Sequence, residues 1–399
     1  MTSACAYRTL IGERSADLAR RARKVMPGGT TRSTLDIKPS PPYIDSGSGF
    51  LVRDVDGREL IDLQNNYTAL VHGHARREIC DAAIDALRDG ASFGLPSEHE
   101  VLLAECLVNR FVPLERLRFT NSGTEAVMMA IRTARTFTAR KTIIRFQGAY
   151  HGTYDDVMGD TSDGVNVLVV PFNDVKALQS AAKGAGLGLA AILVDLMPNR
   201  AGLHPASNEL VGEINHISKR TGALIIVDEV ISGRLSFRGL AAERGLKADL
   251  ATFGKMIGGG FPVGAFGGRA EVMRVFEDEW SPKLSHGGTF TANPVTTSAG
   301  MVALDLFDSH EVSRINALGE RLRSDLSEMG FVTAGCGSLV RLHSADPERV
   351  WWAAYEAGVL ICGNGLMSIS TAMDTSTIDE LEERFKSISK AAGARTDGV

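Results

Sequence analysis

The feature that most constrains the fold is a series of short apolar segments that begins soon after residue 98, most of them separated by stretches long enough to form a helix. These segments predict β-strands at residues 117–120, 142–146, 165–170, 191–196, 224–228, 250–253 and 263–267. Continuous apolar strands that alternate with helices are typical of a largely parallel sheet covered on both faces. The sequence therefore predicts an α/β fold with one large, mostly parallel sheet.

The segments on either side of this region show a different pattern of predicted helices and strands. Residues 11–25 predict a helix that stops at Met26–Gly29, and residues 50–62 predict two strands joined at Asp56-Gly57. After Pro294 the pattern predicts helices at 295–307, 314–329 and 378–391 and weaker strands at 338–343 and 367–371. We expect a smaller α+β domain, with an N-terminal segment (1–61) that packs with it, a large domain (62–310) and a C-terminal small domain (311–399).

Composition excludes several classes of protein. The chain has 399 residues, of which 44% are hydrophobic, and 43 Lys and Arg against 48 Asp and Glu give a net charge of −5. This balance argues against a nucleic-acid partner. No apolar run approaches the roughly 18 residues of a membrane span, and the five cysteines show no CxxC spacing. We expect a cytoplasmic protein without a metal centre, and His72 and His74 lack an obvious third ligand.

Asn121–Ala126 stands between a predicted strand and an apolar helix. A helix N-terminus that follows a strand and carries small polar residues can bind an anion through its backbone N–H groups. The same residues also fit an ordinary capping box, with Ser122 as the N-cap and Glu125 three residues later. Both interpretations stay open at this level.

Two further residues end apolar strands. Asp228 follows Leu224–Val227, and an acid at this edge of a sheet can bind a metal, a ribose or a protonated ring nitrogen, or it can cap a helix. Lys255 follows the strand at 250–253 and precedes three glycines. Met256 excludes a Walker loop, because Ser or Thr is needed there. A lysine in a tight pocket is a candidate Schiff-base amine.

Together these motifs resemble those of the class III (ω-) aminotransferases, which are fold-type-I pyridoxal-phosphate enzymes. The resemblance rests on five ordered motifs, 121–126, 148–152, 228–230, 252–255 and 288–294, and it covers nearly the whole chain from Met26. The chain looks most similar to the branch that holds glutamate-1-semialdehyde 2,1-aminomutase and the β-amino-acid (β-phenylalanine) aminotransferases. The implied fold is a large domain with a mostly parallel seven-stranded sheet and a smaller α+β domain.

The resemblance implies a role for each matching residue. Lys255 forms the Schiff base with the cofactor and moves the proton, Asp228 keeps the pyridine nitrogen protonated, and Tyr150 stacks on the ring. Val230 packs on the opposite face of the ring. The phosphate is implied to bind Ser122, Gly123 and Thr124, together with Thr289 of the neighbouring subunit, which makes a homodimer the active unit.

The implied substrate residues are Arg32, which matches an arginine that holds a substrate carboxylate, and Tyr67, which lines the pocket. A solvated loop arginine is the alternative for Arg32. Asn364 stands where β-amino-acid aminotransferases have an arginine for a second carboxylate, and Asp195-Leu196 replaces the family's Glu-Pro pair. The segment 158–166 is also short for the gating loop of the aminomutase. These departures favour net transamination and leave the use of 2-oxoglutarate open.

The sequence therefore predicts a ping-pong aminotransferase that acts on a carboxylate-bearing amine, such as a β-amino acid, and on a keto acid or aldehyde. A semialdehyde-type aminomutase is the first alternative. A non-catalytic regulatory protein that binds pyridoxal phosphate is the second. All three use small molecules as ligands.

Overall fold

The computed structural model describes residue 7 and residues 9–159 and 166–392, in two compact units. Unit 1 comprises residues 1–76 and 315–399, and unit 2 comprises residues 77–314. Residues 62–76, expected in the large domain, lie in unit 1 instead. The reason is local, because the Asn65 side chain donates a hydrogen bond to the carbonyl of Ser368, 2.8 Å away. That contact keeps this stretch with the C-terminal part of the chain.

Unit 2 is built on a seven-stranded sheet with the strand order β4-β10-β9-β8-β7-β5-β6. The strands are β4 (Arg116–Thr120), β5 (Thr142–Phe146), β6 (Val167–Val170), β7 (Leu189–Val194), β8 (Leu224–Asp228), β9 (Leu250–Gly254) and β10 (Gly264–Gly268). Only β10 runs antiparallel to its two neighbours. The predicted mostly parallel α/β sheet is confirmed, although residue 165 of the third predicted strand lies outside the described residues.

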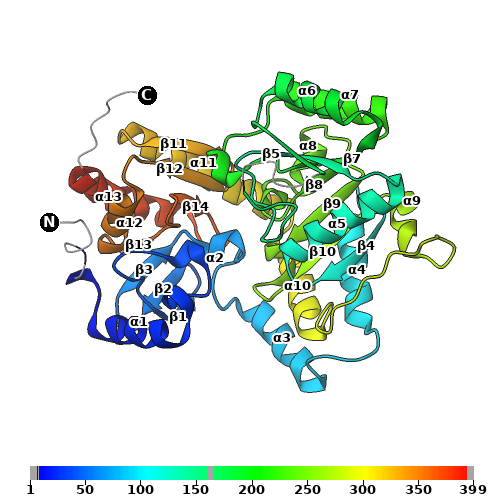
Figure 1. Cartoon of the computed structure of the whole chain (residues 1–399). Helices are drawn as coiled ribbons and strands as arrows, with labels where there is room; N and C mark the ends of the chain where they lie inside the picture. The colour runs from blue at the N-terminus through cyan, green and yellow to red at the C-terminus, as the bar shows by residue number, and fades with distance from the viewer. Residues whose placement is uncertain (1–6, 8, 160–165, 393–399) are drawn as a thin grey trace. The chain divides into compact units, whose positions relative to one another are not determined.

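The helices of unit 2 are α3 (Arg77–Asp89), α4 (Glu98–Arg110), α5 (Gly123–Thr138), α6 (Val175–Ala185), α7 (Asn208–Thr221), α8 (Leu240–Glu243), α9 (Ala270–Met273) and α10 (Pro294–Leu306). Helices α5 to α8 connect strands of this sheet, whereas the other helices come before β4 or after β10 (Figure 1). Helix α5 packs against several strands, and its buried face carries Ala126, Ala130 and Ala134. Small side chains let the helix backbone approach the sheet closely, so α5 is held firmly where the functional motifs converge.

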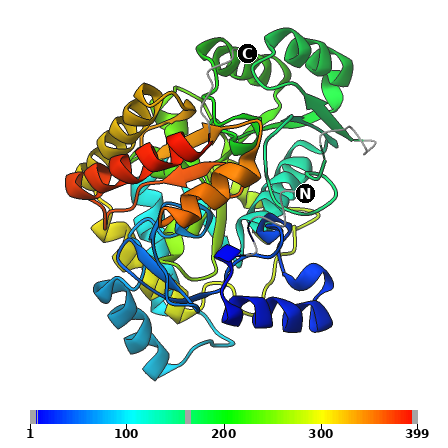
Figure 2. The same cartoon turned by 90° about the vertical axis from the view of Figure 1, so that its left-hand side faces the viewer.

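Unit 1 contains two small sheets. The first has the order β1-β2-β3-β13, with strands Ile44–Ser48, Leu51–Asp54, Glu59–Asp62 and Val359–Leu360. The second has the order β11-β12-β14, with strands Val332–Cys336, Leu339–His343 and Leu366–Ser368. Its helices are α1 (Glu13–Val25), α2 (Asn65–Thr68), α12 (Pro347–Glu356) and α13 (Thr375–Ala392), and α11 (Ser309–Glu328) starts in unit 2. Figure 2 shows α12 and α13 side by side.

Five strands and α-helices of unit 1 among the described residues have no counterpart in the sequence-based prediction: β1, β11, β13, α2 and α12. Strand β1 is largely exposed, β11 is mostly half-buried, and neither carries a long apolar run, so they form because β2 and β12 supply hydrogen-bonding partners. Helix α12 did have a sequence signal, because Asp346 caps it and Pro347 occupies its first turn. Within the described part of the chain, no helix is both long and apolar enough to cross a bilayer.

Candidate active site

The N-terminus of α5 lies at the end of β4. The Ser122 side chain accepts a hydrogen bond from the Glu125 backbone N–H at 3.2 Å. The Glu125 carboxylate in turn accepts from the N–H of Asn121, at 2.6 Å, rather than from the N-cap residue itself. The N–H groups of Gly123 and Thr124 have no carbonyl one turn earlier in the helix. The capping box thus leaves two backbone donors available to an anion.

Close backbone approaches bring other segments to this helix end. Gly152 has a φ of +111°, and a Cβ placed there would lie 2.8 Å from the Thr124 Cα. A Cβ on Gly123 would lie 3.1 Å from both Val230 methyl groups. A Cβ on Gly254 would meet Val230 at 3.5 Å. The ends of β4, β8 and β9 and the loop after β5 are therefore in contact at one edge of the sheet.

Asp228 is buried at the end of β8 and accepts three hydrogen bonds. Oδ1 accepts from the Thr252 hydroxyl and the Val230 N–H, both at 3.1 Å, and Oδ2 lies 2.7 Å from His151 Nδ1. The other ring nitrogen of His151 is buried and has no partner among the described residues. Since a carboxylate offers about four lone-pair positions, one position on Asp228 is left for a further donor.

Two more acids are buried beside Asp228. Burial raises the pKa of Asp195 to about 7, and the negative charge of Asp228 adds to this increase. The Asp195 carboxylate accepts the N–H of Met197 at 2.8 Å. Burial likewise raises the pKa of Glu229, which accepts hydrogen bonds from Ser232 and from the Ala241 N–H. The edge of the sheet beneath the site is therefore rich in acids that resist ionisation.

Lys255 directly follows β9 and is half-buried. Its φ of +50° is unusual for a residue with a side chain, and a short 3₁₀ turn, Lys255–Gly258, begins there. The turn continues into Gly259, whose φ is +61° and whose added Cβ would lie 2.7 Å from the Ala299 carbonyl oxygen. Glycine at this position thus lets α10 press against the turn that carries the lysine.

Tyr150 lies in the loop after β5 and remains 41% exposed. The Arg200 guanidinium carbon lies over its ring, 4.4 Å from the centroid. Val230, the other residue expected against the cofactor ring, is partly exposed. Both side chains belong to unit 2, as do Ser122, Gly123, Thr124, Asp228 and Lys255.

The three residues expected to bind substrate lie in unit 1. Arg32 Nη1 donates to the Asn66 side-chain oxygen at 3.2 Å, and its guanidinium lies 5.5 Å from the Tyr67 ring centroid. The Tyr67 hydroxyl donates to the Thr34 carbonyl at 2.9 Å. The Asn364 side chain accepts the N–H of Leu366 and so closes its own turn. Unit 1 thus brings Arg32 and Tyr67 together.

Thr289 lies on an exposed loop of unit 2. The nearby Thr291 hydroxyl lies 3.5 Å from the Asn121 amide nitrogen, so the loop touches the residue before the α5 cap. The two histidines considered as metal ligands are engaged in unit 1, where His72 contacts Thr371 and His74 contacts Asp62. Residues 160–165, which form most of the short segment noted above, lie outside the described residues.

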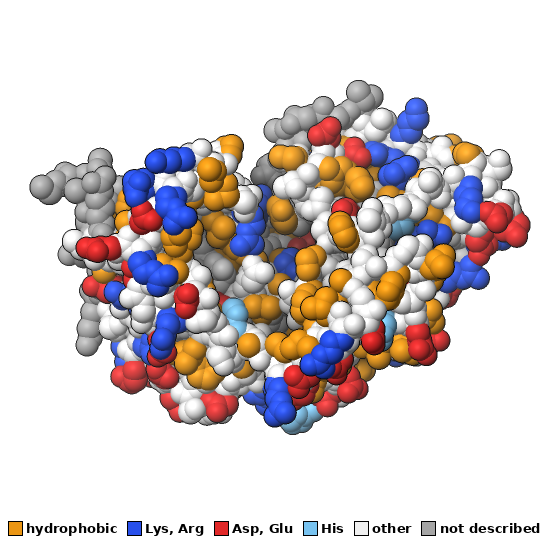
Figure 3. All heavy atoms as spheres, turned by 90° about the horizontal axis from the view of Figure 1, so that it is seen from below, with side chains coloured by type: hydrophobic (Ala, Val, Ile, Leu, Met, Phe, Trp, Pro, Cys, Tyr) orange, Lys and Arg blue, Asp and Glu red, His pale blue; other side chains and the backbone are white. Residues whose placement is uncertain are grey.

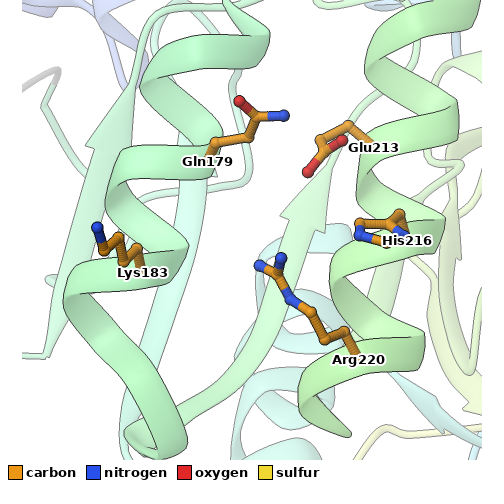
Figure 4. A pocket seen from close by; sticks show the side chains of 5 residues that line it. All are labelled: Gln179, Lys183, Glu213, His216 and Arg220. Atoms are coloured by element: carbon orange, nitrogen blue, oxygen red, sulfur yellow. The ribbon is translucent and has the colours of Figure 1, made fainter.

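A separate hollow of about 470 Å³ lies between α6 and α7 (Figure 4). Its lining consists of Gln179, Lys183, Glu213, His216 and Arg220. None of the predicted site residues lines it.

Sequence analysis missed three contacts of the site. His151 was part of a recognised motif, but nothing in its neighbours showed that it would meet Asp228. Thr252 also stood in a recognised motif and Arg200 did not, but neither contact could be read from neighbouring residues, because the partners lie 24 and 50 positions away in the chain. A hydroxyl three residues before the lysine would have been the only available hint for Thr252.

Pyridoxal phosphate needs an anion site for its phosphate, an acid for its ring nitrogen and an amine for its aldehyde. The carboxyl edge of the unit 2 sheet offers a group for each requirement. The α5 N–H groups suit the phosphate, the open position on Asp228 suits the ring nitrogen, and Lys255 supplies the amine. The fold and this edge define a fold-type-I pyridoxal-phosphate-dependent transferase.

The chain belongs to the aminotransferase class-III family, whose profile matches residues 38–391. Class-III aminotransferases use pyridoxal phosphate, so the cofactor and the enzyme class expected from the sequence are confirmed.

Named relatives fall into the expected branch. A glutamate-1-semialdehyde 2,1-aminomutase from Ignicoccus hospitalis is 38% identical over 343 residues, which cover 81% of each chain. A β-phenylalanine transaminase from Variovorax paradoxus is 38% identical over 333 residues, covering 80% of this chain and 76% of the relative. The crystal structure of an ω-transaminase from Sphaerobacter thermophilus matches with a TM-score of 0.92 and 39% identity, over 97% of this chain and 99% of that one.

Proposed function

We propose that this class-III aminotransferase moves an amino group between a carboxylate-bearing amine, of the β-amino acid class, and a keto acid or aldehyde. The reaction is ping-pong, because one substrate leaves its amino group on the enzyme's cofactor before the second collects it. The observation that carries the proposal is the Asp228 carboxylate, held by three donors and with one position open beside the α5 N-terminus and the Lys255 turn. The β-phenylalanine transaminase relative supports the substrate class.

Each candidate site residue of unit 2 has a proposed role. Asp228 accepts a hydrogen bond from the protonated ring nitrogen at its open lone-pair position. His151 and Thr252 prevent the carboxylate from rotating away. The N–H groups of Gly123 and Thr124 and the Ser122 side chain bind the phosphate. Bound pyridoxal phosphate supplies an electron sink for the bond broken at the amine-bearing carbon.

Lys255 performs the proton transfer. It would hold the cofactor through its amine, and the same amine would take up, hold and deliver the proton of the substrate's amine-bearing carbon. The tightly packed 3₁₀ turn fixes the backbone from which this side chain extends. Tyr150 and Val230 hold the ring from its two faces.

Arg32 is proposed to bind the carboxylate of the amine donor. A guanidinium can make two parallel hydrogen bonds to a carboxylate, which fixes orientation as well as charge. Its contacts with Asn66 and the Tyr67 ring limit its motion while its exposed end stays available. Asn364 is neutral and is proposed to line the pocket without pairing with a charge.

We also propose that the active unit is a homodimer, with Thr289 reaching the phosphate of the partner subunit. Unit 2 exposes several apolar side chains, and Figure 3 shows apolar groups gathered on the face seen from below. The exposed apolar residues of this unit include Ile84, Leu87, Phe93, Leu95, Val101, Leu102 and Phe290. Groups of exposed apolar side chains are typical of interaction surfaces. Sedimentation analysis of the purified protein tests this assembly.

The decisive experiment is a donor-by-acceptor screen that follows the cofactor absorbance. The wild-type protein should change its absorbance with a β-amino acid and recover on addition of a keto acid or aldehyde. Lys255→Ala should abolish turnover, whereas the control Lys219→Ala on the exposed side of α7 should not. The proposal fails if no amino donor changes the wild-type spectrum, or if Lys255→Ala keeps its turnover.

The aminomutase named for several relatives is the second candidate. It would convert a substrate to its isomer without any external keto acceptor. Mass-balance analysis of the product in the absence of acceptor separates the two reactions. A third candidate, a regulatory protein without turnover, predicts a reducible cofactor bond with Lys255 but no product from any donor.

A further inference from the structure

Arg200 is a charged residue at the site for which the proposed function has no task yet. It lies in a short 3₁₀ turn, Asn199–Ala201, that follows β7. The turn is packed tightly, because a Cβ on Gly148 would lie 2.7 Å from the Ala201 Cβ and 2.9 Å from its Cα. The loop that carries Tyr150 and the turn that carries Arg200 are thus fixed against each other.

Stacking determines which part of the guanidinium is available. The Arg200 guanidinium carbon lies 4.4 Å from the Tyr150 ring centroid. A guanidinium held over an aromatic ring keeps the N–H groups of its edge free to bond in its own plane. That edge suits a carboxylate, which accepts two parallel hydrogen bonds.

Among the described residues, no ion pair neutralises the charge of Arg200. Arg200 is exposed, and in the described part of the chain no carboxylate forms an ion pair with it. Asp195, which is the nearest acid along the chain, and Asp228 of the site are buried and engaged with Met197 and His151. An exposed cation beside the ring-stacking tyrosine therefore attracts an anionic ligand to this side of the site.

We propose that Arg200 binds the α-carboxylate of a 2-oxo acid acceptor and so determines the preference of the enzyme for keto acids over aldehydes. The inference rests on the proposed aminotransferase function and adds to it the chemical class of the second substrate. Arg32 serves the carboxylate of the β-amino acid donor, and Arg200 serves that of the acceptor. Two separate arginines let the enzyme accept substrates whose carboxylates stand at different distances from the reacting carbon.

The test compares acceptors with and without a carboxylate. Enzyme first converted to its amine-loaded form is mixed with pyruvate or with propanal, and the second half-reaction is followed by absorbance. Arg200→Gln should lower the specificity constant for pyruvate about ten- to hundredfold, as expected for the loss of a charged hydrogen-bonding pair, and leave that for propanal unchanged. The specificity constant of Arg200→Lys for pyruvate should lie between those of the wild type and Arg200→Gln. Arg220→Gln, which removes an exposed arginine on α7, is the matched control.

A binding measurement supplies a second readout. Glutarate carries carboxylates but no keto group, and its dissociation constant for the holoenzyme can be measured by calorimetry. Arg200→Gln should weaken glutarate binding by a similar factor, while the control variant should not. The donor half-reaction with a β-amino acid should keep its rate constant and its KM.

Three outcomes would overturn the inference. Equal losses for pyruvate and propanal, together with weaker cofactor binding, would mean that Arg200 only positions Tyr150. If Arg200→Gln leaves the ratio of the specificity constants for pyruvate and propanal unchanged, Arg200 has no part in the choice of acceptor. If wild-type enzyme shows no transamination at all, the proposed function has failed, and equal glutarate binding by wild type and Arg200→Gln would then reject the carboxylate site as well.

Discussion

Gly152→Ala is a sharp test of the geometry at the phosphate end of the site. Gly152 has a φ of +111°, a conformation that side chains rarely adopt. An added Cβ would lie 2.6 Å from the Thr124 hydroxyl oxygen, 2.7 Å from its methyl carbon and 2.8 Å from its Cα. The side chain of Thr124 can rotate, but its Cα belongs to the first turn of α5 and must be displaced. Alanine at 152 therefore pushes on the helix end proposed to bind the phosphate.

The size of the effect follows from two costs. Holding a non-glycine residue at such a φ costs about 1 to 3 kcal/mol. Overpacking against a backbone atom costs about 1 to 3 kcal/mol more. Gly152→Ala should therefore lower the free energy of unfolding by about 2 to 6 kcal/mol. Because the displaced N–H groups are the ones proposed to bind the charged phosphate, cofactor affinity should fall about tenfold or more.

The assay is urea unfolding of the apoprotein, combined with a cofactor titration followed by absorbance. Gly212→Ala is the matched control, because Gly212 lies within α7 and an added Cβ meets nothing within 4 Å. This variant should be more stable by about 0.5 to 1 kcal/mol and bind cofactor normally. Wild-type stability and affinity in Gly152→Ala would refute the close approach between Gly152 and Thr124.

Three further changes have defined outcomes. Asp195 keeps its proton in the folded protein up to a pKa of about 7, against an ordinary value of 3.8, so stability falls as pH rises through this window. Asp195→Asn should abolish that fall and be more stable than wild type by up to about 4 kcal/mol at pH 8, measured by urea unfolding. Ser122→Ala should cost about 1 kcal/mol and weaken cofactor binding, whereas Ser207→Ala, which removes the cap of α7, should cost stability alone. Arg32→Gln should raise the KM for a β-amino acid about tenfold or more without affecting an amine that lacks a carboxylate.

Each of these predictions has a contrary result. Parallel pH profiles for wild type and Asp195→Asn would show that the buried carboxyl does not hold its proton. Equal effects of the two serine variants on cofactor binding would remove Ser122 from the phosphate site. If Arg32→Gln raises the KM for an amine without a carboxylate as much as the KM for the β-amino acid, the arginine does not bind the donor carboxylate.

The large sheet was readable from the sequence because its strands are apolar on both faces. β5 and β8 start and end where the sequence predicted, at Thr142–Phe146 and Leu224–Asp228. β1 was missed because a strand that is exposed along its length carries no such pattern. Ser122, Gly123, Thr124, Asp228 and Lys255, which are proposed to hold the cofactor, were recognisable for a related reason, since they end or follow a strand or open a helix directly in the chain.

The sequence by itself determined the class of enzyme, its cofactor and the order of the chemical groups along the chain. Only the tertiary structure decided which groups meet. His151 reaches Asp228 across 77 positions, Gly152 lies against Thr124, and Arg200 covers Tyr150. The physical reason is that the strand order β4-β10-β9-β8-β7-β5-β6 differs from the chain order, so loops distant in sequence gather at one edge of the sheet.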